Sequence, residues 1–146
     1  MDIEVKIDPA CPAAKLILVT PELTEEQEQL LRRLSGETPR VLTGLRDGTV
    51  TVLDPAEVVR VYAGGGKVFA VTGDGEYTLR LRLYEAEARL DPTQFVRISH
   101  SEFINLRKVR QFDLNLAGTI SVTFTDGAIS YVSRRYVTKV KRILGI

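Results

Sequence analysis

Hydrophobic and polar residues follow two different patterns, which divide the chain into a short first part and a long second part. In the first part, a short apolar run at residues 16–19 predicts a strand. Thr24 and Gln27 have the spacing of a capping box, and Gly36 is typical of a helix end. One face of the helix between them carries four leucines: Leu23, Leu30, Leu31 and Leu34. We therefore predict a strand-helix extension over residues 1–40, whose leucine face packs against the rest of the chain or a second copy.

The second part consists of short alternating segments separated by turn signals, which is typical of antiparallel β-structure. Hairpin turns are indicated by three glycine-containing sequences, at residues 47–48, 73–75 and 126–127. Residues 83–90 predict a short helix, and the chain ends in a predicted amphipathic helix with Ser133 as its N-cap. We predict that residues 41–146 form one mainly β domain with short helices.

The composition is that of a globular protein, with 44% hydrophobic and 27% charged residues. No apolar run approaches the roughly 18 residues of a membrane-spanning helix. The N-terminus lacks the basic start and apolar core of a secretion signal, so we expect a cytoplasmic protein. Cys11 is the only cysteine, which excludes an internal disulfide and a cysteine-based metal cage.

The net charge of +1 conceals an asymmetry along the chain. Residues 1–94 contain 11 Lys and Arg against 16 Asp and Glu, whereas residues 95–146 contain 9 against 3. A basic C-terminal third indicates a face for a polyanion such as nucleic acid. The alternative is that both signs of charge mix on the folded surface.

Signals for catalysis are weak. His100, the single histidine, has no cysteine partner and no serine in a nucleophile-elbow turn. The sequence "AGGGKVF" lacks the P-loop spacing and has Val68 where a serine or threonine would hold magnesium. It is better interpreted as a flexible tip between strands that carries Lys67 outward. We expect no catalytic residues, no cofactor, no metal site and no small-molecule substrate.

Two polar segments have the chemistry of a nucleic-acid contact. In "FVRISHSEFINLRKVR" (residues 95–110), short hydroxyl side chains and arginines can bind phosphate oxygens, and His100 can reach base edges. The alternative is that His100 is an ordinary surface or turn histidine whose hydrogen bonds are satisfied and which has no role in binding. In the second segment, the helix N-terminus at Ser133 favours phosphate, and Arg134 and Arg135 lie on its first turn. An ordinary solvated basic face is the alternative for that helix, and we prefer it for three later residues: Lys139, Lys141 and Arg142.

Both segments resemble the hallmark stretches of the LytTR family, the mainly β DNA-binding domain of bacterial response regulators. The resemblance rests on Phe95, Arg97, Ser99, His100, Ser101, Phe103, Ile104 and Asn105, followed by Ser133, Arg134, Arg135, Tyr136 and Val137. It extends over residues 41–146 and is most specific in its last third. What it implies is an elongated arrangement of small antiparallel sheets whose loops enter successive major grooves.

The resemblance also implies roles for individual residues. Base contacts fall on His100, Arg135 and Lys67. Candidates for phosphate contacts are Arg97, Ser99, Ser101, Arg107 and Arg134. Asn105 and Ser133 are expected to be structural at the loops. The sequence departs from the family pattern at His100, where lysine or arginine is common, and at the glycine-rich loop beside Lys67, where bulkier residues are usual.

Many members of the family carry a receiver domain, but only about 40 residues precede this domain here, and they lack an acidic pocket. We expect a stand-alone transcriptional regulator that binds repeated half-sites in double-stranded DNA as a homodimer. Residues 1–40 would serve self-association or dock an inhibitory protein. The alternative is a protein-interaction or ligand-sensing β-domain with an incidental basic surface. An RNA-binding module is a third possibility, for which five Phe and five Tyr offer few stacking platforms.

Overall fold

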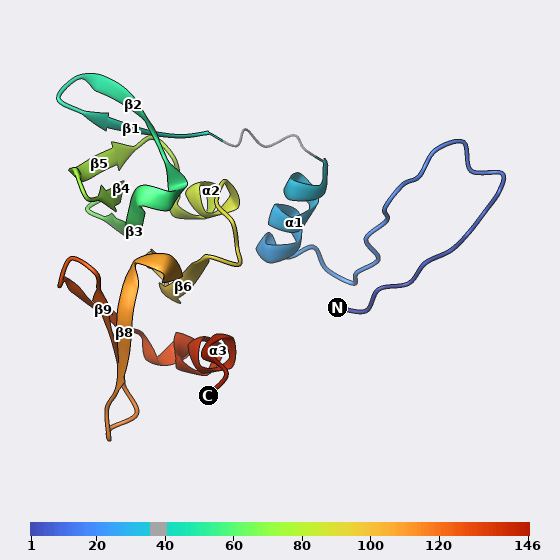
Figure 1. The fold of residues 1–146 in the computed structure, drawn as a ribbon. Coiled ribbons are helices and arrows are strands. Elements are labelled where there is room, and N and C mark those ends of the chain that lie inside the picture. The colour runs from blue at the N-terminus through green and yellow to red at the C-terminus, as the bar shows by residue number, and fades with distance from the viewer. Residues whose placement is uncertain (36–40) are drawn as a thin grey trace.

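The computed structural model describes residues 1–35 and 41–146, and within them it is mainly β, as the sequence predicts (Figure 1). The helices are α1 (Glu25–Ser35), α2 (Leu83–Ala88) and α3 (Arg134–Leu144). The strands are β1 (Leu42–Arg46), β2 (Thr49–Leu53), β3 (Val58–Gly64), β4 (Lys67–Thr72), β5 (Gly75–Leu79), β6 (Phe95–Ser99), β7 (Glu102–Asn105), β8 (Val109–Leu114), β9 (Ile120–Phe124) and β10 (Ile129–Val132). Two 3-10 turns, Pro55–Glu57 and Leu106–Lys108, lead into β3 and β8.

The strands form two antiparallel sheets. The larger has the order β2-β1-β5-β4-β3-β7-β6, and the smaller has the order β10-β9-β8. The predicted hairpin turns are confirmed, since they join β1 to β2, β4 to β5 and β9 to β10. At the first of these turns, Asp47 and Gly48 have φ angles of 51° and 78°, the left-handed values that a tight two-residue hairpin turn requires.

Strands β3, β7 and β6, at one end of the large sheet, separate two hydrophobic cores, because side chains on a strand point alternately to opposite faces. Val58, Val61, Phe95 and Phe103 face the core that α2 covers. Val59, Val96, Ile98 and Ile104 face the core that β9, β10 and α3 cover. The small sheet and the C-terminal helix therefore pack on one side of the large sheet, while α2 packs on the other. Figure 1 shows the tip of the β8–β9 hairpin extending away from the rest of the two sheets.

The N-terminal extension contains the predicted helix but not the predicted strand. The capping box is formed, with Thr24 N–H donating to Gln27 Oε1 at 3.1 Å and Gln27 N–H donating to Thr24 Oγ1 at 3.3 Å. The strand prediction at residues 16–19 is wrong: these residues have no neighbouring strand to supply ladder hydrogen bonds, and Leu16, Ile17 and Val19 are 71–91% exposed. The helix end predicted at Gly36 and the end of the extension predicted at residue 40 fall within residues 36–40, outside the described residues.

Helix α1 lies beside α2 and makes few contacts there (Figure 1). Gln29 Nε2 donates to the Tyr84 carbonyl of α2 at a distance of 3.5 Å. Arg33 Nη2 donates to the Glu87 carbonyl of α2, also at 3.5 Å. The leucine face is only partly covered, since Leu23 and Leu34 remain 52% and 57% exposed. In residues 1–35 and 41–146, none of the helices has the length and apolar character to cross a membrane.

Asn105 fixes the point where β7 passes into the turn before β8. Its side chain is fully buried, with Nδ2 donating to the Val58 carbonyl at 2.8 Å and Oδ1 accepting from Arg107 N–H at 3.0 Å. We expect Asn105→Ala to lower the free energy of unfolding by about 2–3 kcal/mol, because both backbone groups lose their partner. Urea denaturation of the purified variant measures this.

The matched control is Asn115→Ala, whose side chain makes an exposed 2.8 Å hydrogen bond to Thr119 Oγ1 in the β8–β9 turn. That change should alter stability by no more than about 0.5 kcal/mol. Equal effects of the two substitutions would contradict a structural role for the buried Asn105 amide.

Candidate nucleic-acid interface

Three exposed segments come together around the β6–β7 loop. They are the β3–β4 turn with Lys67, the β6–β7 loop with His100 and Ser101, and the first turn of α3 with Arg134 and Arg135. We call these three segments the contact face.

Two backbone hydrogen bonds hold the contact face together. On one side of the β6–β7 loop, Ala63 N–H donates to the Ser101 carbonyl at 2.8 Å and brings the end of β3 to the loop. On the other side, Ser133 N–H donates to the Ile98 carbonyl at 2.9 Å and brings the start of α3 to the same loop. The three residues predicted to contact bases are therefore presented by neighbouring segments, and each of them is exposed.

The β6–β7 loop is shaped by a β-bulge. Arg97 pairs with Phe103 and Ser99 pairs with Glu102, so the register shifts by one residue just before the loop. Such a bulge bends a strand and redirects the side chains that follow. Ser101 N–H donates to Ser99 Oγ at 3.2 Å, and the two hydroxyl oxygens are 3.4 Å apart. The serines thus fold the loop tightly and leave His100 exposed at its tip.

The β3–β4 turn is a tip between two strands with Lys67 exposed, as the sequence predicts. Gly64 pairs with Lys67, so the connection is a two-residue hairpin turn. Its central residues, Gly65 and Gly66, have φ angles of 59° and 77°, which glycine adopts without strain. The three consecutive glycines therefore form a tight turn, and Lys67 is the first residue of β4.

Ser133 occupies the N-cap position of α3, but its hydroxyl makes no capping hydrogen bond. Its contribution is through the backbone, where its N–H donates to the Ile98 carbonyl. Arg134 and Arg135 follow on the first turn and are both exposed. The backbone, not the hydroxyl, therefore positions this end of the helix against β6.

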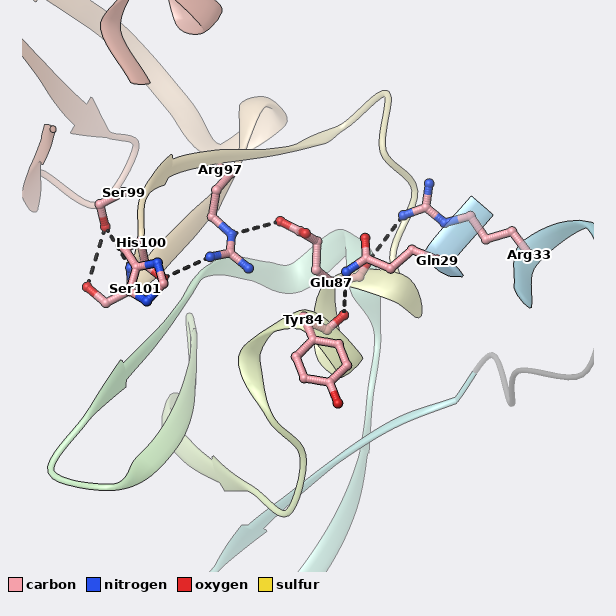
Figure 2. Close-up of polar contacts among 8 residues, drawn as sticks. All are labelled: Gln29, Arg33, Tyr84, Glu87, Arg97, Ser99, His100 and Ser101. Atoms are coloured by element: carbon pink, nitrogen blue, oxygen red, sulfur yellow. Dashed lines mark hydrogen bonds and ion pairs between the residues drawn. The ribbon is translucent and has the colours of Figure 1, made fainter. Parts of the chain in front are cut away.

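Arg97 lies behind the contact face, with its side chain only 15% exposed. Its Nε is 3.0 Å from Glu87 Oε2, and its Nη1 donates to the His100 carbonyl at 2.8 Å (Figure 2). Sequence reasoning missed Glu87 altogether, because a helix residue ten positions upstream carries no local sign of the strand residue it will meet. The phosphate contact predicted for Arg97 stays a prediction.

Arg107 lies at the opposite end of the β6–β7 hairpin from His100. The neighbouring Leu106 N–H donates to the Gln94 carbonyl at 2.7 Å, where β6 begins. Nearby, hydrogen bonds from the Thr93 backbone and hydroxyl, with a further contribution from the charge of Arg107, lower the pKa of Asp91. Arg107 is thus separated from the contact face by the length of β7.

Glu102 is a second residue at this site that sequence reasoning missed. Its Oε2 accepts from Arg60 Nη1 at 3.1 Å and from Ser130 Oγ at 2.8 Å, which joins the large sheet to β10 of the small sheet. Because Arg60 pairs with this carboxylate, the acidic residue next to the β6–β7 loop is neutralised. The exposed charges that remain on the contact face are the cations Lys67, Arg134 and Arg135.

Comparisons with known proteins show the family and the fold of this chain. A family model described as the LytTr DNA-binding domain matches residues 48–145. Two Staphylococcus aureus proteins, from strains NCTC 8325 / PS 47 and MRSA252, carry the name HTH-type transcriptional regulator. Each is 28% identical to this chain over 127 residues, which is 86% of both chains.

A solved LytTr DNA-binding domain from Bacillus cereus shares the fold, with a TM-score of 0.69. It is 20% identical and covers 73% of this chain and 97% of its own. The resemblance drawn from the two hallmark segments is therefore confirmed. Because the family model matches more than half of the 146 residues, this chain belongs to the LytTR DNA-binding domain family.

Proposed function

We propose that this chain is a sequence-specific transcriptional regulator that reads double-stranded DNA through the contact face, with its segments entering successive major grooves. Membership of the LytTR family supports DNA binding and transcriptional regulation. The observation that carries the finer proposal is the pair of backbone hydrogen bonds, from Ala63 to Ser101 and from Ser133 to Ile98, that joins three exposed polar segments. Selection of bound sequences from a random duplex library, at two salt concentrations, tests it directly.

We assign base contacts to His100, Arg135 and Lys67, which are exposed on the three segments of the contact face. Phosphate contacts are assigned to Ser101 and Arg134 on the contact face. Those predicted for Arg97, Ser99 and Arg107 stay predictions. A duplex-binding surface needs both kinds of contact, because phosphate contacts position the protein while base contacts specify the sequence.

The domain is small, and a few phosphate contacts give limited affinity at cellular salt. We therefore propose that it binds repeated half-sites as a homodimer, in the cytoplasm, where bacterial DNA is found. The partly exposed leucine face of α1 supports a role of residues 1–40 in self-association or in docking an inhibitory protein. Helix α1 also borders the cleft that His100, Ser101 and Lys139 line, so a partner bound to α1 would lie close to the contact face.

Arg135→Ala should cost about 1–3 kcal/mol in binding to the selected duplex and relax the preference at one base position. The reason is that a lost base contact removes discrimination at the base it reads. Arg134→Ala, which removes the same charge from the same helical turn, is the matched variant. It should weaken all duplexes about equally and reduce the salt slope by about 1. Fluorescence anisotropy with single-base variants of the duplex measures both, and identical behaviour would refute this division of roles.

Self-association through α1 predicts that Leu31→Glu combined with Leu34→Glu converts a dimer into a monomer, because two charges enter an apolar contact. Leu116→Glu is the matched control, since Leu116 is fully exposed at the β8–β9 turn. Sedimentation equilibrium of the full chain reports the mass. A monomer before any substitution, or a dimer that survives the double substitution, would contradict this use of the leucine face.

A further inference from the structure

Arg97 connects helix α2 to the tip of the β6–β7 loop. Its Nε meets Glu87 Oε2 at 3.0 Å, while its Nη1 donates to the His100 carbonyl at 2.8 Å (Figure 2). A guanidinium is planar and its donors have fixed directions relative to one another. The carboxylate that holds Nε therefore also fixes the direction from which Nη1 reaches His100.

The alternation of side chains along β6 explains why Arg97 faces inward. Val96 and Ile98 face the core beneath the small sheet, so Arg97 between them points to the opposite face, where α2 packs. The side chains of Arg97 and Glu87 are only 15% and 22% exposed. Direct contact with a phosphate would require this partly buried ion pair to open.

The loop that Arg97 holds is short and carries the predicted base contact. His100 is tied through its backbone carbonyl, which leaves its side chain exposed for DNA. Groups that act on a ligand need their backbone held in the productive geometry by residues that do not themselves touch the ligand. Arg97 and Glu87 have this arrangement, because Arg97 contacts the main chain of the loop and Glu87 contacts the side chain of Arg97.

We propose that Glu87 is a positioning residue for DNA recognition: it orients Arg97, which fixes the backbone at His100 and so the base preference of the β6–β7 loop. This inference rests on the proposed function. Glu87 also contacts α1, because Arg33 Nη2 donates to the Glu87 backbone carbonyl at 3.5 Å. One residue of α2 therefore contacts both the N-terminal extension and the arginine that supports the contact face (Figure 2).

Glu87→Gln tests the proposal, because it keeps the size of the side chain and removes the charge that orients Arg97. We expect discrimination at one base position of the selected duplex to fall about tenfold, with an unchanged salt slope, because no phosphate contact is removed. In the DNA-free protein, amide exchange at His100 and Ser101 should accelerate about tenfold as the loop loosens.

Two further variants complete the design. Arg97→Lys keeps the positive charge but cannot span Glu87 and His100 with one planar group, and it should reproduce both effects. It also decides the question if Glu87→Gln is unfolded at the assay temperature, as judged by thermal melting. Glu57→Gln is the control for charge, because it removes one carboxylate from a surface pair with Lys108 at 3.7 Å. It should keep the discrimination and exchange rates of the unsubstituted protein.

Unchanged amide exchange in Glu87→Gln and Arg97→Lys would overturn the inference, whatever the DNA binding shows. Faster exchange with unchanged base discrimination would also overturn it, because the loop would then be held without any effect on recognition. Tighter binding of Glu87→Gln to all duplexes, beyond any effect of Glu57→Gln, would instead identify Arg97 as a phosphate contact, because its guanidinium would no longer have to leave a carboxylate to reach DNA. If the proposed function itself is wrong, the unsubstituted protein will show no preferred duplex. Amide exchange at the loop would still accelerate in Glu87→Gln, so the two failures can be told apart.

Discussion

The pair of backbone hydrogen bonds that flank the β6–β7 loop is the constraint on which the site depends. One joins Ala63 N–H to the Ser101 carbonyl and the other joins Ser133 N–H to the Ile98 carbonyl. They extend the pairing of β3 with β7, and the packing of α3 in the same core as β6, as far as the loop. With them, residues far apart in the sequence share one surface, and the two sheets are joined where that surface forms.

The position of β6 explains how so few bonds are sufficient. Phe95 belongs to the core under α2, while Val96 and Ile98 belong to the core under the small sheet. A strand fixed by hydrophobic packing on both faces cannot rotate without exposing apolar surface on one of them. The bulge before Ser99 then turns the chain out of this rigid strand into the loop. The β6–β7 loop is thus short and polar, and it is anchored in a strand that packs on both faces.

The sequence predicts well those features that depend on local chemistry. The hairpin turns at Asp47-Gly48 and Asp126-Gly127, the capping box at Thr24 and the amphipathic end of the chain all follow from neighbouring residues. The prediction of a strand at residues 16–19 was wrong because strand formation depends on a pairing partner, which an apolar run cannot supply by itself.

Tertiary placement accounts for what the sequence could not supply at the site. Motif spacing places Arg97 and Arg107 in one polar segment, yet one lies behind the loop against α2 and the other lies at the far end of the hairpin. Glu87 and Glu102 become part of the site only when a helix and a second sheet pack against the strands. Charge alone would have assigned all these residues to the surface.

On the proposed function, the three segments of the contact face bind one duplex together. Amide chemical-shift changes, recorded while the selected duplex is titrated into labelled protein, test this most directly. We expect changes at Lys67, His100, Ser101, Arg134 and Arg135 that saturate at the same DNA concentration. Changes confined to one segment, or centred on the β8–β9 hairpin, would contradict it.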